Sequence, residues 1–118
     1  MRIGILDSGF DTTHIAFEGK DIIKLYSDQY LEKFGTGVNA TQQSHGSHVA
    51  GIASGNSSVN YGVAKDASLL LLYSTIQGPT MIYEVADLYK KAIETYDDVK
   101  IYSNSWGWVR GLFCYGDI

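Results

Sequence analysis

The chain has 118 residues, of which 45% are hydrophobic and 19% are charged, and its formal net charge is −4. This length allows one domain at most, and the balance of apolar and charged residues is typical of a globular protein and excludes a disordered chain. No basic patch suggests a nucleic acid partner, and no apolar run approaches the roughly 18 residues of a membrane-spanning helix. We therefore expect one domain over residues 1–118, with neither nucleic acid nor membrane as a partner.

The first elements in chain order are two short strands. Residues 2–7 form an apolar run that ends at Ser8-Gly9, and residues 21–26 form a second run with the same character. Both patterns predict buried strands closed by turn residues. Residues 27–44 are polar and rich in Gly, Thr, Asn and Gln, which predicts a long loop, and loops of that length are usually functional.

A helical pattern follows from His45 to about Ser54, with Ser44 as its expected N-cap. Val49, Ile52 and Ala53 fall on one face of that helix. Residues 69–73 are uninterrupted apolar residues, as in a strand that is buried on both faces.

A second helix is predicted to begin at Pro79-Thr80, because apolar residues then recur with helical spacing. The residues expected on its buried face are Ile82, Val85, Ala86, Tyr89, Ile93 and Tyr96. Residues 99–102 read as a fourth strand, which leads into Ser105-Trp106-Gly107.

Strands that alternate with helices predict an α/β fold, a three-layer sandwich around a mostly parallel sheet with about four core strands and two main helices. In such sheets ligands bind at the carboxyl ends of the strands. Asp7 ends the first strand, His45 opens the first helix, and Ser105-Trp106-Gly107 follows the last strand. The topology therefore predicts that these residues converge on one rim of the sheet.

Asp7 and His45 have the chemistry of a catalytic acid and base. A histidine has a pKa near neutral pH, which suits a general base, and a helix N-terminus disfavours extra positive charge on it. A carboxylate on the other ring nitrogen would fix the tautomer and stabilise the imidazolium formed during reaction. Taken singly, however, an aspartate at a strand end or a histidine at a helix start is more often a turn or capping residue.

The complete phrases are more specific. Ile5-Leu6-Asp7-Ser8-Gly9 and His45-Gly46-Ser47-His48-Val49-Ala50-Gly51 resemble the acid and base signatures of the subtilisin-like serine proteases (subtilases, peptidase S8). They follow in the order Asp then His, as in subtilisin itself. Tyr61-Gly62-Val63-Ala64-Lys65-Asp66-Ala67 is similar to the segment before the family's third core strand, and Ser105-Trp106-Gly107 resembles its substrate-cradling strand.

The resemblance implies an incomplete, subtilisin-like fold that carries the Asp and His motifs of a peptidase domain. Asp7 and His45 would be catalytic, Ser105, Trp106 and Gly107 would bind a peptide or protein substrate, and Gly78 would mark the opposite wall of the groove. The family's Gly-Thr-Ser-Met-Ala type motif around the nucleophile and its oxyanion-binding asparagine are absent. We therefore expect the isolated chain to lack proteolytic activity.

Two functions remain open. The chain could be part of a serine endopeptidase whose nucleophilic serine is supplied elsewhere, or a catalytically inactive scaffold or interaction protein with the same fold. In either case strand 99–104 is an open edge, and uncovered edges tend to pair. We expect the remaining half of the protease domain, or a partner chain, to cover it. A third possibility, a nucleotide-binding domain, lacks a phosphate-cradling Gly-rich loop.

No metal or cofactor is expected. His48, His45 and Asp7 could be read as a zinc site, but the i, i+3 spacing and the lack of an adjoining glutamate argue against it. We expect His48 to be a packed structural residue and His14 a surface or turn residue. An acidic residue that often helps to hold calcium in the family is replaced by Ala16 or Phe17, which argues against a calcium site.

The compartment stays open. Cys114 is the single cysteine, so it is either a buried thiol or paired outside the chain. Asn39-Ala40-Thr41 and Asn56-Ser57-Ser58 match the glycosylation pattern, which also occurs often by chance.

Overall fold

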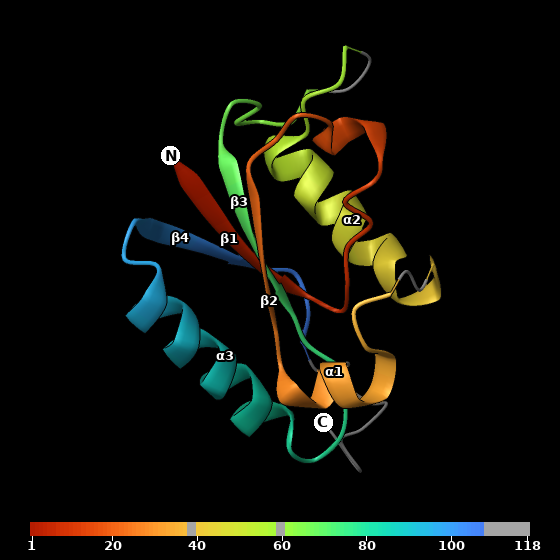
Figure 1. Ribbon diagram of the computed structural model, residues 1–118, viewed down its shortest axis with the longest axis vertical. Helices are drawn as coiled ribbons and strands as arrows, with labels where there is room; N and C mark the ends of the chain where they lie inside the picture. Colours follow the sequence, from red (N-terminus) through yellow and green to blue (C-terminus); the bar gives the residue numbers. More distant parts are fainter. Residues whose placement is uncertain (38–39, 59–60, 108–118) are drawn as a thin grey trace.

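The computed structural model describes residues 1–37, 40–58 and 61–107 as an α/β fold (Figure 1). Its four strands are β1 (Arg2–Asp7), β2 (Ile22–Tyr26), β3 (Ser68–Tyr73) and β4 (Val99–Asn104). They pair in the order β2-β3-β1-β4, and every pairing is parallel. The helices are η1 (Ile15–Phe17, a 3-10 turn), α1 (Asp28–Phe34), α2 (Ala40–Ser54) and α3 (Met81–Thr95). The predicted parallel α/β sheet is confirmed.

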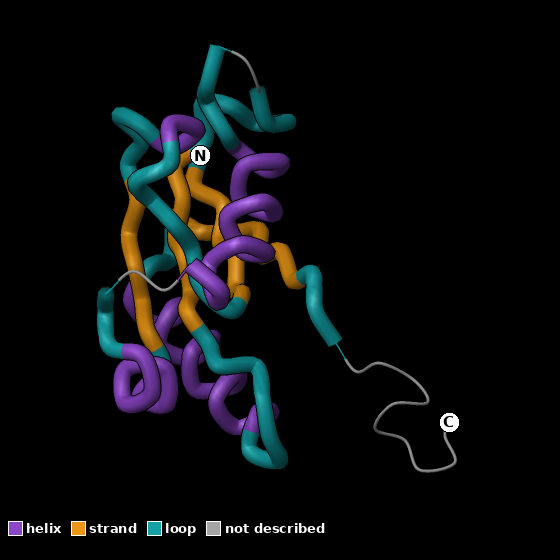
Figure 2. Tube along the Cα trace, turned by 90° about the vertical axis from the view of Figure 1, so that its right-hand side faces the viewer, coloured by secondary structure: helices purple, strands orange, loops and turns teal. Residues whose placement is uncertain are grey.

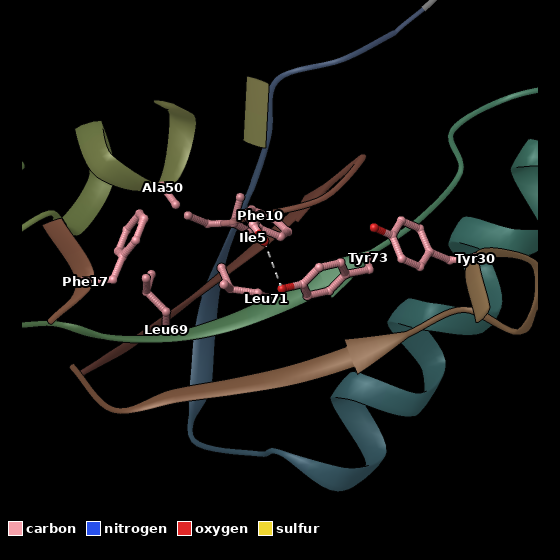
Figure 3. Packing of buried hydrophobic residues seen from close by; sticks show 8 residues of the cluster. All are labelled: Ile5, Phe10, Phe17, Tyr30, Ala50, Leu69, Leu71 and Tyr73. Atoms are coloured by element: carbon pink, nitrogen blue, oxygen red, sulfur yellow. Dashed lines mark hydrogen bonds between the residues drawn. The ribbon is translucent and has the colours of Figure 1, made fainter. Parts of the chain in front are cut away.

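Helices α2 and α3 cover opposite faces of the sheet, as Figures 1 and 2 show. Successive side chains of a strand point to opposite faces, so each central strand supplies both cores. The core on the α2 side contains Ile5, Leu69, Leu71 and Ala50 (Figure 3). The core on the α3 side contains Leu6, Leu70, Leu72, Leu88 and Ala92. Leu69–Leu72 have no exposed surface, which explains why the run is uninterrupted and confirms the predicted three layers.

Helix α2 begins earlier than the sequence predicted. It starts at Ala40, so Ser44 lies inside the helix and the prediction of an N-cap at Ser44 is wrong. Residues 40–43 contain no Gly or Pro to stop a helix, but their polarity resembled a loop. His45 therefore lies in the second turn. The helix dipole acts mainly within the first turn, so it no longer explains a neutral His45.

Helix α1 replaces part of the predicted loop at residues 27–44. Ser27 is its N-cap, since its hydroxyl oxygen accepts a hydrogen bond of 2.9 Å from the backbone N–H of Tyr30. Gly35, with φ 66°, ends the helix in a conformation that favours glycine. Tyr30 anchors α1, because its ring is buried against Tyr73 with centroids 5.3 Å apart. Helix α1 thus connects the end of β2 to the core.

The buried face of helix α3 matches the predicted one in part, because Val85, Tyr89 and Tyr96 pack against the α3-side core as expected. The buried residues are Met81, Glu84, Leu88 and Ala92, whereas Ile82 and Ile93 are 65% and 60% exposed. The prediction considered apolar residues alone. The row of buried residues on α3 contains the polar Glu84, so the apolar pattern did not reveal it.

The aromatic cluster at the carboxyl end of β2 and β3 should make the fold sensitive to alkali. Burial raises the pKa of the phenols of Tyr26, Tyr30 and Tyr73, most strongly for Tyr73. As pH rises past about 10, these tyrosines therefore ionise in the unfolded chain before they ionise in the folded one. The stability that the buried phenols contribute is fully present below that pH and is lost above it. We expect Tyr73→Phe to lose less stability than wild type between about pH 8 and about pH 11 in urea unfolding. Equal losses in both proteins would contradict this account.

Candidate active site

Asp7 is held at the end of β1 on the face that α2 covers. The alternation that places Ile3 and Ile5 in the α2-side core gives Asp7 the same orientation. Its side chain is 2% exposed, and a buried carboxylate needs hydrogen-bond donors. Ser8 supplies two of them, its backbone N–H at 2.7 Å and its hydroxyl at 3.2 Å from Oδ1.

His45 supplies a further donor. Its Nδ1 lies 3.0 Å from both carboxylate oxygens of Asp7. An ionised carboxylate only accepts hydrogen bonds, so the contact requires the ring hydrogen to be on Nδ1. The lone pair is then on Nε2, which is the state a general base needs. The His45 side chain is 58% exposed, so the base is accessible from solvent while its carboxylate partner is not.

Gly46 and Ser47 explain why α2 approaches β1 so closely. A Cβ atom at Gly46 would lie 2.0 Å from the carbonyl oxygen of Gly9 and 3.2 Å from Cβ of Asp7, so only glycine fits there. The hydroxyl of Ser47 accepts a hydrogen bond of 2.7 Å from the backbone N–H of Asp11. These two residues of the His motif thus dock the helix on the loop that follows Asp7.

The segments after β3 and β4 flank the end of β1. The backbone N–H of Ser74 donates to the carbonyl oxygen of Asp7 at 3.0 Å, on the β3 side. On the β4 side, Nε1 of Trp106 donates to the carbonyl oxygen of Leu6 at 3.0 Å. Trp106 packs on the α3-side core, so its indole lies on the sheet face opposite Asp7, while Ser105 and Gly107 are exposed. All five predicted site residues therefore lie at one rim, but only Asp7 and His45 meet directly.

Two further histidines lie near this rim. His48 is exposed, so the expectation of a packed structural residue is wrong; the core at that level of α2 is filled by Ala50 instead. His14 is an exposed turn residue, as expected, and its Nδ1 accepts from the backbone N–H of Ala16 at 3.1 Å. Ala16 and Phe17 are buried in the core. In the described part of the chain, no three His, Cys, Asp or Glu residues are grouped in a way that could hold a metal ion.

The outer face of α2 carries a hollow of about 880 Å³, and His45 is not one of the residues that line it. Ser44, Ser47 and His48 line it, together with Ile15, Ile52 and Tyr61, which are 63%, 57% and 62% exposed. Ile52 was expected on the buried face of α2, and that expectation is wrong. A helix buried on one side only must place some of its residues outward, and Ala50 and Ala53 supply the inward contacts.

At one edge of the described sheet lies β4, with Ile101 55% exposed. None of the helices in residues 1–37, 40–58 and 61–107 has the length and apolar character needed to cross a bilayer. Cys114 lies outside the described residues, and so does Asn39 of the sequence Asn39-Ala40-Thr41. Asn56, in the second such sequence, is described and is exposed.

Comparison of the sequence with known protein families shows to which family the chain belongs. The model of the subtilase family matches residues 1–113. The chain belongs to the subtilase family. A subtilisin-like proteinase Mp1 of Magnaporthiopsis poae is 38% identical over 69 residues, which cover 56% of this chain and 14% of that protein. Subtilisin-like protease 2 of Trichophyton verrucosum is 31% identical over 96 residues, which cover 79% of this chain and 18% of that protein.

A subtilisin-like protease 2 of Arthroderma otae matches to the same extent as the Trichophyton protein. This subtilase chain thus spans less than a fifth of the length of these curated relatives. No solved structure is a significant match to it. The subtilase match and the parallel sheet agree on a partial subtilase fold.

We expect Gly46→Ala to separate α2 from β1. The added methyl group meets backbone, so the helix must move, at a cost of about 1–3 kcal/mol in the free energy of unfolding. Gly51→Ala is the matched control in the same helix, because a Cβ atom there meets nothing within 4 Å. It should stabilise the chain by up to about 1 kcal/mol, since alanine favours helix over glycine. Urea unfolding measures both, and a stabilising Gly46→Ala would contradict the docking described here.

Proposed function

We propose that this chain carries the acid and the base of a subtilisin-like serine endopeptidase, which hydrolyses peptide bonds. The observation that supports this most strongly is the hydrogen bond between Nδ1 of His45 and the buried carboxylate of Asp7. Family membership supports it independently, because the relatives are subtilisin-like proteases. The nucleophilic serine, in this proposal, is supplied by a part of the protease outside residues 1–118.

In the proposed mechanism, a serine hydroxyl gives its proton to Nε2 of His45 while its oxygen attacks the scissile carbonyl carbon. Asp7 holds the imidazole in the required tautomer and stabilises the imidazolium that forms. His45 then gives the proton to the leaving amine, which departs and leaves an acyl-enzyme. Water hydrolyses this ester with His45 again acting as the base. Ser8 serves the same step indirectly, because its two hydrogen bonds orient the carboxylate.

The substrate backbone, we propose, lies in extended form between the segments that follow β3 and β4. Ser105, Trp106 and Gly107 form one wall, and the segment that contains Gly78 forms the other. The strand order β3-β1-β4 supports this proposal, because the end of β1 lies between the ends of β3 and β4. A peptide strand added there gains affinity from main-chain hydrogen bonds, and the side-chain pockets beside it set sequence preference.

The remaining part of the protease is the proposed partner. Two features of the described surface support this proposal: the exposed edge of β4 with Ile101, and the hollow on the outer face of α2 with exposed Ile52 and Tyr61. Open strand edges and clustered apolar side chains are both features of surfaces that another chain segment covers.

The alternative is a catalytically inactive scaffold of the same fold. The missing nucleophile motif favours it, whereas the oriented Asp7–His45 pair favours the enzyme. Reading the gene beyond the codon for Ile118 separates the two. A downstream Gly-Thr-Ser phrase supports the enzyme, and a stop codon supports the scaffold.

The activity test uses the complete gene product, with unfolded casein as substrate and a serine-directed inhibitor as the control for mechanism. We expect Asp7→Asn to lower kcat by roughly ten-thousandfold, the order of magnitude typical when the orienting aspartate of a Ser-His-Asp triad is changed. The exposed Asp66 is the matched control, and Asp66→Asn should leave kcat unchanged. A complete product that cleaves casein equally well with Asp7→Asn would contradict the assignment. Inhibitor-sensitive cleavage by the isolated 118-residue chain would contradict the external nucleophile.

A further inference from the structure

The segment after β3 has an unusual backbone. Ile76 has φ 47°, in the left-handed region that a β-branched residue rarely adopts. Such conformations persist only where the surrounding contacts determine them, and they cluster at ligand-binding segments. Gly78, two residues later, also has a positive φ, of 81°, but glycine tolerates it without strain. The strain is therefore at Ile76, and its neighbours should show what maintains it.

Glu84 is the contact that holds this segment. Its carboxyl group is part of the buried stripe of α3, and the residue is 2% exposed. Oε2 accepts hydrogen bonds from the backbone N–H of Thr75 at 2.8 Å and from the hydroxyl of Ser27 at 2.5 Å. Oε1 accepts from the hydroxyl of Thr75 at 2.6 Å. One carboxyl group thus binds both groups of Thr75 and the N-cap of α1.

Ser74 completes the turn. It has no exposed surface, and its hydroxyl oxygen accepts from the backbone N–H of Ile76 at 3.1 Å. The Ile76 side chain packs against the α3-side core. Figure 1 shows α1, the segment after β3 and the first turn of α3 at the same end of the molecule. Glu84 ties these three together at that end.

We propose that Glu84 is a positioning residue that presets the segment Thr75–Gly78 as one wall of the substrate groove. This inference rests on the proposed function. It says that a buried side chain, which does not itself contact the peptide, increases the affinity of the groove for an extended peptide. A wall already fixed in its binding conformation loses less conformational entropy when a peptide pairs with it. The role requires hydrogen-bond acceptors, because an apolar residue would leave the part-buried N–H of Thr75 without its hydrogen bond to Glu84 and free the turn.

Two substitutions at Glu84 separate positioning from packing. Glu84→Met keeps the length of the side chain but has no oxygen acceptor. Glu84→Gln is the conservative rescue, since its carbonyl oxygen can accept from Ser27 and from the Thr75 N–H, while its amide donates to the Thr75 hydroxyl. Lys33→Ala is the control on the same segment, because it removes an exposed hydrogen bond of 3.0 Å from Nζ to Oε1 of Gln77.

The experiment measures binding of fluorescein-labelled casein, an unfolded protein, to the complete 118-residue chain, together with amide hydrogen exchange at Thr75. We expect Glu84→Met to raise Kd about tenfold and to expose the Thr75 amide, since hydrogen bonds to a charged group are lost. Glu84→Gln and Lys33→Ala should keep Kd within about threefold of wild type. The NMR signals of His45 should be unchanged in all of these variants, because the hydrogen bonds described for Glu84 go to Ser27 and Thr75 and not to Asp7 or His45.

If Glu84→Met binds casein as tightly as wild type while its Thr75 amide exchanges freely, the proposed role of Glu84 is overturned and the proposed groove is not. Wild-type chain that does not bind casein would overturn the proposed groove, and the role of Glu84 with it. If Glu84→Met does not fold, Thr75→Val tests the proposal instead. Valine has the shape of threonine but lacks the hydroxyl that donates to Glu84. A raised Kd for Thr75→Val supports the proposal, and an unchanged Kd contradicts it.

Discussion

The contact between Asp7 and His45 depends on a single close approach, that of α2 to the end of β1. A carboxylate as buried as that of Asp7 is tolerated only with donors around it, and Ser8 and His45 supply them. The approach in turn requires a glycine at position 46, because any side chain would meet the backbone of Gly9. The His motif therefore contains two kinds of information: the base itself, and the small residue that lets the base reach its acid.

The parallel sheet explains why the other features of the site gather around this pair. Parallel strands end at the same rim, so the segments after β3 and β4 lie on either side of β1. Trp106 ties one of them to Leu6, and Ser74 ties the other to Asp7. On the solvent side the rim is asymmetric, with a buried acid and an accessible base.

The sequence was informative where one pattern dominated. The apolar run in residues 2–7 predicts the strand that ends at Asp7, and the run at residues 69–73 predicts a doubly covered strand. It was less informative where polar residues take part in the structure. The start of α2 at Ala40 was missed because residues 41–43 are polar, and α1 was missed although Ser27-Asp28 is a capping signal. The buried face of α3 was misplaced in part because Glu84 is a polar residue in its stripe. The hydrogen bonds of Glu84 depend on three distant segments, which no local pattern encodes.

The tautomer of His45 tests the central claim most directly. At neutral pH, ¹⁵N NMR of the imidazole distinguishes a hydrogen on Nδ1 from one on Nε2. For the neutral imidazole, the account predicts the hydrogen on Nδ1, and loss of this preference in a chain where alanine replaces Asp7. An imidazole with its hydrogen on Nε2, or one indifferent to the removal of Asp7, would contradict it.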